Sequence, residues 1–399
     1  MTDLDGFRCI YCGVEKPGSE RTLEHLWPRR LGGASAPDVF KTRDVCGRCN
    51  NNVGLFVDGE FQRSFFMSVA AISAALPFLD PNRRVPLPLA YAGVIPVALD
   101  DGEICETWIG PRGERIYHFH MRDDEVRFGT YAGGDPIRRR RRDPGRVYMS
   151  FSRPNLFWIE TALLSVRTAF PRAPLRLLTR TDVSQIVECC SPEDDQSRSD
   201  RAHLAPIWRE KQGQSTMQIN LDYGKRFQAK LALGLGYNLF GPAFAQLPYE
   251  ETLRSVLRET DPQRRATLPF IGSSILAPLP PDPVIDRLAY EGAFTFLFNG
   301  GRQGVFFTIF TPNRKRLDTQ IAPGPLRLPS DLLEQHHGSF VVLVLPGLGQ
   351  SIGPISMGHY GLHRFGSAAH PVLSQIDARR LTIDEIERRL AGHEIPQTT

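Results

Sequence analysis

The sequence lacks any long apolar run. Across 399 residues there is no stretch of about 18 apolar residues, which excludes a membrane-spanning helix. The longest apolar stretches, such as the one from Phe340 to Leu345, have the length of a β-strand. No secretion signal precedes the first motif. We therefore expect a cytoplasmic protein that does not contact a membrane.

Cysteine is also scarce, with seven residues in the chain. Four of them form two Cys-x-x-Cys pairs: Cys9 and Cys12, and Cys46 and Cys49. Each such turn places two sulfurs on one side of a tight loop, and four thiolates suit a tetrahedral, closed, structural Zn²⁺. Disulfides are the alternative, but the cytosol keeps thiols reduced. The sequence therefore predicts a structural zinc site. The other three cysteines are expected to be free thiols: Cys105, Cys189 and Cys190.

The net charge of +4 is small, but the charge is unevenly distributed. Residues 1–80 hold nine Lys plus Arg and ten Asp plus Glu, whereas residues 112–180 hold fifteen Arg, no Lys and seven acids. The second segment contains a run of five arginines: Arg138, Arg139, Arg140, Arg141 and Arg142. Such groups contact phosphates and supply sequence-independent affinity for nucleic acid. The run therefore predicts a nucleic-acid contact, with a solvated loop or a subunit contact as the alternatives.

An insert of 33 residues (13–45) separates the two cysteine pairs and carries Glu24 next to His25. Neighbours on a strand point to opposite faces, so these two side chains have different roles. A histidine with a pKa near 6.5 can take a proton from water at neutral pH, and a carboxylate can hold a hard divalent cation. The alternatives are a plain zinc ribbon and a buried structural His25 beside a surface Glu24.

In this combination, residues from about 7 to 75 resemble the HNH endonuclease family, a ββα-metal nuclease, in the subgroup with a four-cysteine zinc site. The resemblance implies a phosphodiester hydrolase that acts on nucleic acid, with DNA as the default substrate and RNA as the alternative. It implies that His25 is the general base that activates water. It also implies that Glu24 and Asn50, the residue after Cys49, hold a catalytic Mg²⁺ or Mn²⁺.

The chain departs from the family pattern at the positions that support the histidine. An Asn that orients the catalytic histidine in many members is missing from the stretch Lys41 to Val45. Thr42 or a backbone carbonyl is the candidate replacement. The Lys that often follows the final Asn is also missing. Asp58 lies two turns beyond Asn50 on the expected helix, where it could support the metal site or face solvent.

The chain as a whole is predicted to be an α+β protein. The small zinc-stapled ββα module (1–78) precedes a larger mixed body. That body divides into a β-rich and then helical, Arg-rich region (79–190) and an α+β region of no assigned family (191–399). Periodicity and turn signals predict helices at 50–76, 154–171, 223–241 and 379–390, and strands at 107–109, 116–121, 126–131, 294–298, 305–310 and 340–345. Asn299 to Gly301 predicts a hairpin turn, and the polar stretch 191–203 predicts an exposed loop.

Two further features leave alternatives open. His118 and His120 alternate along an expected strand and would face the same side, but no third metal ligand is visible in the sequence. The long body suggests a sensor that answers an activating ligand or partner protein, as in effectors of antiviral or mobile-element systems. The rival hypotheses are a zinc-dependent nucleic-acid-binding protein without catalysis and a protein–protein adaptor.

Overall fold

The computed structural model describes residues 6–96, 99, 102–121, 145–151, 155–179, 190–210, 215–216, 223–273, 282–301, 303–324 and 339–393. The chain divides into two compact units, each treated by itself below. Unit 1 comprises Met1–Gln62, Ser73–Phe78 and Leu221–Arg380. Unit 2 comprises Arg63–Ile72, Leu79–Asn220 and Leu381–Thr399. The α+β class is confirmed, and the division of the chain at 78 and 190 stays a prediction.

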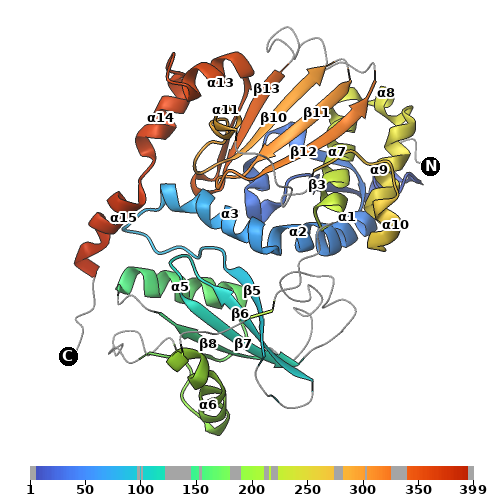
Figure 1. Cartoon of the computed structure of the whole chain (residues 1–399). Coiled ribbons are helices and arrows are strands. Elements are labelled where there is room, and N and C mark those ends of the chain that lie inside the picture. The colour runs from blue at the N-terminus through green and yellow to red at the C-terminus, as the bar shows by residue number, and fades with distance from the viewer. Residues whose placement is uncertain are drawn as a thin grey trace. The chain divides into compact units, whose positions relative to one another are not determined.

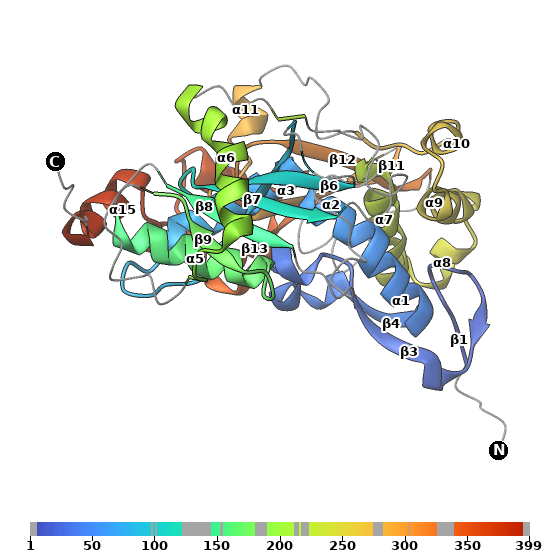
Figure 2. The ribbon, with the colours of Figure 1, turned by 90° about the horizontal axis from the view of Figure 1, so that it is seen from below.

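The N-terminal part of unit 1 is a small cysteine-rich module of two hairpins and a helix. Its elements are β1 (Phe7–Arg8), β2 (Glu15–Lys16), β3 (Arg21–His25), β4 (Lys41–Cys46) and α1 (Gly47–Val53). β1 pairs with β2, β3 pairs with β4, and both pairs are antiparallel. α1 contacts both β3 and β4, and Figure 2 shows the three side by side. The expected ββα arrangement is therefore present.

The helix expected at 50–76 is present but is not one continuous α-helix. The chain instead forms α1, a π-helical segment (Gly54–Asp58), α2 (Gly59–Arg63) and α3 (Phe65–Ala75), followed by a short 3-10 turn (Leu76–Phe78). The π turn ends in two buried residues, Val57 and Asp58, and the burial continues through Gly59, Glu60 and Phe61 of α2. Asp58 therefore faces the interior of unit 1.

The larger part of unit 1 is an antiparallel sheet in the order β12-β11-β10-β13-β14. The strands are β10 (Phe294–Gly301), β11 (Gly304–Phe310), β12 (Arg316–Pro323), β13 (Ser339–Leu345) and β14 (Gln350–Ser356). The strands expected at 294–298, 305–310 and 340–345 are confirmed, as is the hairpin. Its turn is displaced, because the strands pair as far as Gly301 and Gly304 and the residues expected to turn lie inside β10.

Helices cover both faces of this sheet (Figure 1). On one face lie α7 (Tyr223–Phe240), α8 (Pro242–Ala245), α9 (Pro248–Arg258) and α10 (Pro262–Ala266). On the other lie α11 (Pro283–Asp286), α13 (Met357–Arg364) and α14 (Pro371–Arg379). The helix expected at 223–241 is confirmed. The helix expected at 379–390 is confirmed as α15 (Ile383–Leu390), but it begins four residues later, because α14 ends at Arg379 and a break follows.

Trp27 anchors the cysteine-rich module to the sheet of unit 1. Its fully buried ring lies 4.9 Å from the ring of Phe296 and 5.0 Å from that of Phe294, centroid to centroid. The rings of Phe61 and Phe227 stack on each other and meet Trp27 edge-on. Aromatic pairs of this kind contribute about 0.5–1.5 kcal/mol each beyond the area they bury. The segment that follows His25 is thus part of the main core.

Unit 2 is built on a sheet in the order β5-β6-β7-β8-β9, in which the last pair is parallel. Its strands are β5 (Ala90–Ile95), β6 (Glu103–Ile109), β7 (Arg115–Met121), β8 (Arg146–Ser150) and β9 (Leu175–Leu177). The strands expected at 107–109 and 116–121 are confirmed, and the helix expected at 154–171 appears as α5 (Leu156–Ala169). The expected strand at 126–131, the Arg138–Arg142 run and Cys189 lie outside the described residues.

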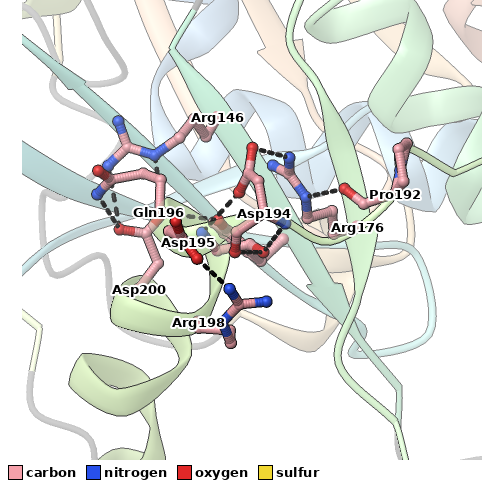
Figure 3. A network of polar contacts seen from close by, with 10 residues as sticks. Arg146, Arg176, Pro192, Asp194, Asp195, Gln196, Arg198 and Asp200 are labelled. Carbon is pink, nitrogen blue, oxygen red and sulfur yellow. Dashed lines mark hydrogen bonds and ion pairs between the residues drawn. The ribbon is translucent and has the colours of Figure 1, made fainter.

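The stretch 191–203, expected to be an exposed loop, instead leads into α6 (Asp195–Glu210). Asp194 caps the helix by accepting a hydrogen bond from the Ser197 amide at 2.8 Å. Asp200 is fully buried because the Arg146 guanidinium holds its carboxylate through two hydrogen bonds, at 2.7 and 3.1 Å (Figure 3). Tyr148 donates a third at 2.6 Å. The expected exposure holds for most of the stretch, in which only Ser197 and Asp200 are buried, but residues from Asp195 onward form a helix and not a loop.

α5 and α6 pack on opposite faces of the unit 2 sheet. Side chains alternate along the strands, so Ile116 meets the α5 core while Tyr117 meets the α6 core. No helix among the described residues is long and apolar enough to cross a membrane.

Candidate active site and zinc site

Four thiols meet at the base of the N-terminal module. The sulfur atoms of Cys9, Cys12, Cys46 and Cys49 all lie within 4.8 Å of one another. Cys9 and Cys12 lie on the turn between β1 and β2, and Cys46 precedes α1, so that Cys49 falls in its first turn. The Cys46 amide donates to the Cys9 sulfur at 3.4 Å. Backbone N–H groups and a helix N-terminus stabilise thiolates.

The donor set of this cluster fits a zinc ion. The hydrogen bond from the Cys49 thiol lowers the pKa of Cys9 to about 4, and the same contact raises the pKa of Cys49. One thiol therefore ionises at the expense of its neighbour, because adjacent thiolates repel each other. A tetrahedral Zn²⁺ removes that conflict, with sulfurs about 2.3 Å from the metal and thus about 3.8 Å apart. Zinc held in this way stabilises the fold without taking part in chemistry.

Two arginines of α9 hold the first cysteine turn in place. Arg254 is buried and donates to the Ile10 carbonyl at 3.0 Å, and its guanidinium is paired with Glu250. Arg258 donates to the Tyr11 carbonyl at 3.3 Å and to the Cys12 carbonyl. The first cysteine turn is thereby tied to a helix that lies more than 240 residues further along the chain.

Glu24 faces the interior rather than solvent, with a relative exposure of 3%. Its Oε1 atom accepts a hydrogen bond from the Tyr11 hydroxyl at 3.1 Å and lies 2.7 Å from the Lys230 ammonium. The structure records no hydrogen bond from the described residues to the other oxygen, Oε2. One oxygen is thus fixed by the protein. The role of Glu24 as a metal ligand stays a prediction. Oε2 is the oxygen that would bind the ion.

Lys230 connects Glu24 to Asp58. This lysine comes from α7, is fully buried, and donates to both carboxylate oxygens of Asp58 at 2.8 Å. It also donates to the His25 carbonyl at 3.1 Å. Burial alone would lower the pKa of Lys230, but Asp58 and Glu24 outweigh burial and raise it. Two carboxylates share this one cation, and burial raises the pKa of Asp58 to about 6.

His25, at the end of β3, is half-buried. Burial and the nearby Arg29 lower its pKa below the usual 6.5. The imidazole is therefore neutral at pH 7, as a general base must be before it takes a proton. No described residue hydrogen-bonds to its ring. Thr42 pairs with Glu24 across the hairpin, and its hydroxyl accepts from the Asp44 amide at 3.2 Å, so no hydrogen bond among the described residues supports its expected role in orienting the imidazole.

Asn50 ties α1 to β3. Its side-chain nitrogen donates to the Thr22 hydroxyl at 3.0 Å and to the Leu23 carbonyl at 3.1 Å, next to Glu24. The amide oxygen is a suitable ligand for a hard cation. Whether Asn50 and Glu24 hold one ion together stays a prediction, as does the metal-supporting role of Asp58.

Sequence reasoning missed Lys230, Tyr11 and Arg254. Lys230 did leave a signal, because it is the lone charged residue among the apolar residues from Ala229 to Leu235, and a buried charge must be paired. Tyr11 and Arg254 left none, because their partners are set by tertiary contacts.

Paired strands and a following helix, held together by four clustered thiols, form a ββα module in which a half-buried histidine follows a buried carboxylate in the sequence. Residues 9–66 match the family model described as HNH endonuclease, so the resemblance expected from the sequence is confirmed over that segment. The match covers the N-terminal module and leaves the rest of the chain unassigned. No curated protein and no solved structure matches the chain.

Proposed function

We propose that the protein is a metal-dependent endonuclease that hydrolyses phosphodiester bonds in nucleic acid, with His25 as the general base. One observation carries the proposal: within the segment that matches HNH endonucleases, His25 is a half-buried imidazole with a lowered pKa at the end of β3, beside Glu24. A neutral, partly accessible imidazole is the form that can accept a proton from water.

The reaction at this site is a hydrolysis. A water oxygen attacks the phosphorus, its proton passes to the unprotonated ring nitrogen of His25, and the bond to the leaving oxygen breaks as that oxygen takes a proton from water. A bound Mg²⁺ or Mn²⁺ would neutralise the developing phosphate charge and the leaving oxygen. Glu24, through Oε2, and Asn50 are the proposed ligands. Tyr11 and Lys230 fix the Glu24 carboxylate through Oε1, and Asp58 supports it by holding Lys230.

DNA is the proposed substrate, with RNA as the alternative. We assign phosphate contact to the Arg138–Arg142 run, because the segment around it has a net charge of +8 from fifteen Arg and seven acids. Replacing these five arginines by serine should flatten the slope of log affinity against log salt, by about 0.9 for each duplex DNA phosphate that is no longer neutralised. An unchanged slope would show that the run does not touch the nucleic acid.

The remainder of the chain is proposed to recognise an activating ligand or partner protein, as the sensor of a cytoplasmic effector in antiviral or mobile-element defence. The support is the relative length of the two parts, because a short module that matches nucleases precedes a much longer body. This argument is an analogy. Cleavage that appears only after a defined small molecule or protein is added would establish the sensor. Full activity of the purified chain without any addition would refute it.

The test of the nuclease is cleavage of supercoiled plasmid and of single-stranded RNA by the full chain with Mg²⁺, Mn²⁺ or excess EDTA. We expect nicked or linear DNA with either metal and none with EDTA. Binding without cleavage under every condition would favour the second candidate, a zinc-dependent nucleic-acid-binding protein. The pairing of Glu24 Oε1 with Lys230 is the observation that keeps that candidate in view, because an ammonium already neutralises the carboxylate.

A further inference from the structure

Three metal-ligating side chains that the nuclease does not use gather in unit 2. Glu106 lies on β6, and His118 and His120 lie on the adjacent strand β7 (Figure 1). The register places Glu106 directly opposite His118 and Ile104 opposite His120, so the three polar side chains share one face of the sheet. All three side chains are almost completely buried, with exposures of 2% for Glu106, 6% for His118 and 4% for His120.

The spacing of the ligand atoms fits a bound cation. His120 Nε2 lies 3.2 Å from Glu106 Oε1, and His118 Nδ1 lies 3.7 Å from Glu106 Oε2. One ligand atom from each residue lies within 4.8 Å of the other two. Zinc bonds to nitrogen and carboxylate oxygen are about 2.0–2.2 Å long, which places the ligand atoms of a tetrahedral site about 3.4 Å apart.

The tautomer of His120 leaves one ring nitrogen, Nε2, able to bind such a cation. Its Nδ1 atom lies 3.0 Å from the Met121 carbonyl oxygen, which only accepts, so Nδ1 carries the hydrogen. In the neutral ring, Nε2 then presents a lone pair to Glu106 Oε1. Neither Nε2 nor Oε1 has a hydrogen-bond partner among the described residues. Two buried acceptors 3.2 Å apart repel each other unless a proton or a metal ion lies between them.

The surroundings fix the three ligands as metal sites usually require. Trp108 donates from Nε1 to Glu106 Oε2 at 3.3 Å, and the His120 ring is held by its backbone carbonyl partner. Hydrogen bonds to the far side of a ligand orient it and set its tautomer. The Phe170 ring lies 4.5 Å from that of His118, and a Cβ added at Gly145 would lie 2.9 Å from His118 Nε2. There is little room for the imidazoles to turn away.

We propose that Glu106, His118 and His120 bind a divalent transition metal, Zn²⁺, as a second metal site of this chain, separate from the four-cysteine cluster. Two imidazoles and one carboxylate are a recurrent set for this ion. The ligands come from neighbouring strands, so the ion pins β6 to β7 inside the sheet. The site is independent of the proposed nuclease activity. The competing occupant is a proton on His120 Nε2, which would make a buried ion pair with Glu106.

The experiment is zinc content per chain, measured by mass spectrometry after the full protein is loaded with excess Zn²⁺ at pH 7.5 and passed through a desalting column. Wild type should retain two ions, one for each cluster. His120→Ala and Glu106→Gln should each retain one. His203→Ala, which removes another histidine of unit 2, is the matched control and should retain two. A single ion in the wild type, or two in both His120→Ala and Glu106→Gln, would overturn the proposal.

A second readout covers the case in which those variants do not fold. Wild type is stripped of metal and titrated with Co²⁺ under anaerobic conditions. The cysteine cluster gives strong sulfur-to-cobalt charge-transfer absorption, whereas a site of nitrogen and oxygen ligands gives weak visible bands alone. We expect the visible bands to grow through a second equivalent of Co²⁺ after the charge-transfer band saturates. Saturation of both signals at one equivalent would leave the proton as the occupant and refute the site.

Discussion

The Lys230 ammonium lies 2.7 Å from Glu24 Oε1, although the two residues are 206 positions apart. Lys230 comes from α7 under the main sheet, and Glu24 comes from β3 of the cysteine-rich module. Both are buried, and Asp58 completes the set through hydrogen bonds of 2.8 Å. The proposed active-site carboxylate is therefore oriented by the body of the protein.

Replacement of Lys230 by methionine should destabilise unit 1 strongly. Glu24 and Asp58 would then be buried without a cation, and breaking a buried ion pair in this way costs about 3–5 kcal/mol. Chemical denaturation, followed by tryptophan fluorescence because Trp27 lies in the adjoining core, would measure the change. Lys315→Met removes an exposed lysine of the same unit and should change the free energy of unfolding by less than about 0.5 kcal/mol. Equal stability of the two variants would show that Lys230 does not carry this role.

Gly234 on α7 should tolerate no side chain. A Cβ there would lie 2.1 Å from Leu26 Cδ2, next to the Glu24–His25 pair in sequence. Gly234→Ala should destabilise by about 1–3 kcal/mol through overpacking, although alanine is the better helix former by about 1 kcal/mol. Gly224→Ala on the same helix meets its nearest neighbour at 3.7 Å and should be neutral or stabilising.

A compensating change separates overpacking from other causes. Leu26→Ala removes the atoms that clash, so in the Gly234→Ala background it should cost less than it does alone. Thermal unfolding of the four proteins in this double-mutant cycle gives the coupling energy. Strict additivity would contradict the contact.

Cys49→Ser should remove the structural zinc. Three thiolates and a hydroxyl bind zinc more weakly than four thiolates, and α1 begins at this site. We expect the loss of one zinc ion per chain and faster proteolysis within residues 6–60. Cys190→Ser, outside the cluster, is the matched control and should retain both zinc and protease resistance. Unchanged zinc content in Cys49→Ser would exclude the four-cysteine site.

Glu60 should make stability depend on pH. Burial raises its pKa to about 7, with Arg226 and Arg265 opposing the shift, against an unfolded value near 4.5. The folded state therefore binds the proton more tightly, so its contribution to stability is full below pH 4.5 and is lost as the pH rises through 7. Glu60→Gln removes that loss and should stabilise the protein at pH 8 by up to about 3 kcal/mol relative to pH 5. If the free energy of unfolding differs between variant and wild type by the same amount at pH 5 and at pH 8, this assignment is contradicted.

Local pattern was enough to predict the elements that depend on periodicity and spacing. The two Cys-x-x-Cys turns, the hairpin of β10 and β11 and the continuous helix α7 all follow from residues close in sequence. The π turn that ends at Asp58 did not, because tertiary burial of Val57 and Asp58 overrides the helical period. α6 was missed because its buried carboxylate, Asp200, is paired with Arg146 and Tyr148 on a distant strand.

The candidate site likewise combines residues that the local sequence predicts with residues that only the tertiary structure identifies. Glu24, His25 and the four cysteines are visible in one short segment, whereas the partner of Glu24 comes from a helix far along the chain. The histidine pair on β7 was visible, but its third ligand, Glu106, emerges only when the register of β6 against β7 is known. Short sequence spacing predicts ligands on one turn or one strand, and it carries no information on which strands become neighbours.

The central claim is that His25 is the base of a metal-dependent nuclease, and its most direct test is the rate of plasmid cleavage in Mg²⁺ by His25→Ala. His359→Ala, an exposed histidine of the same unit, is the matched control, and zinc content is checked in each protein. Removal of a general base should lower the rate by about 10²- to 10⁴-fold while zinc stays bound and the control cleaves like wild type. Cleavage by His25→Ala at the wild-type rate would contradict the assignment.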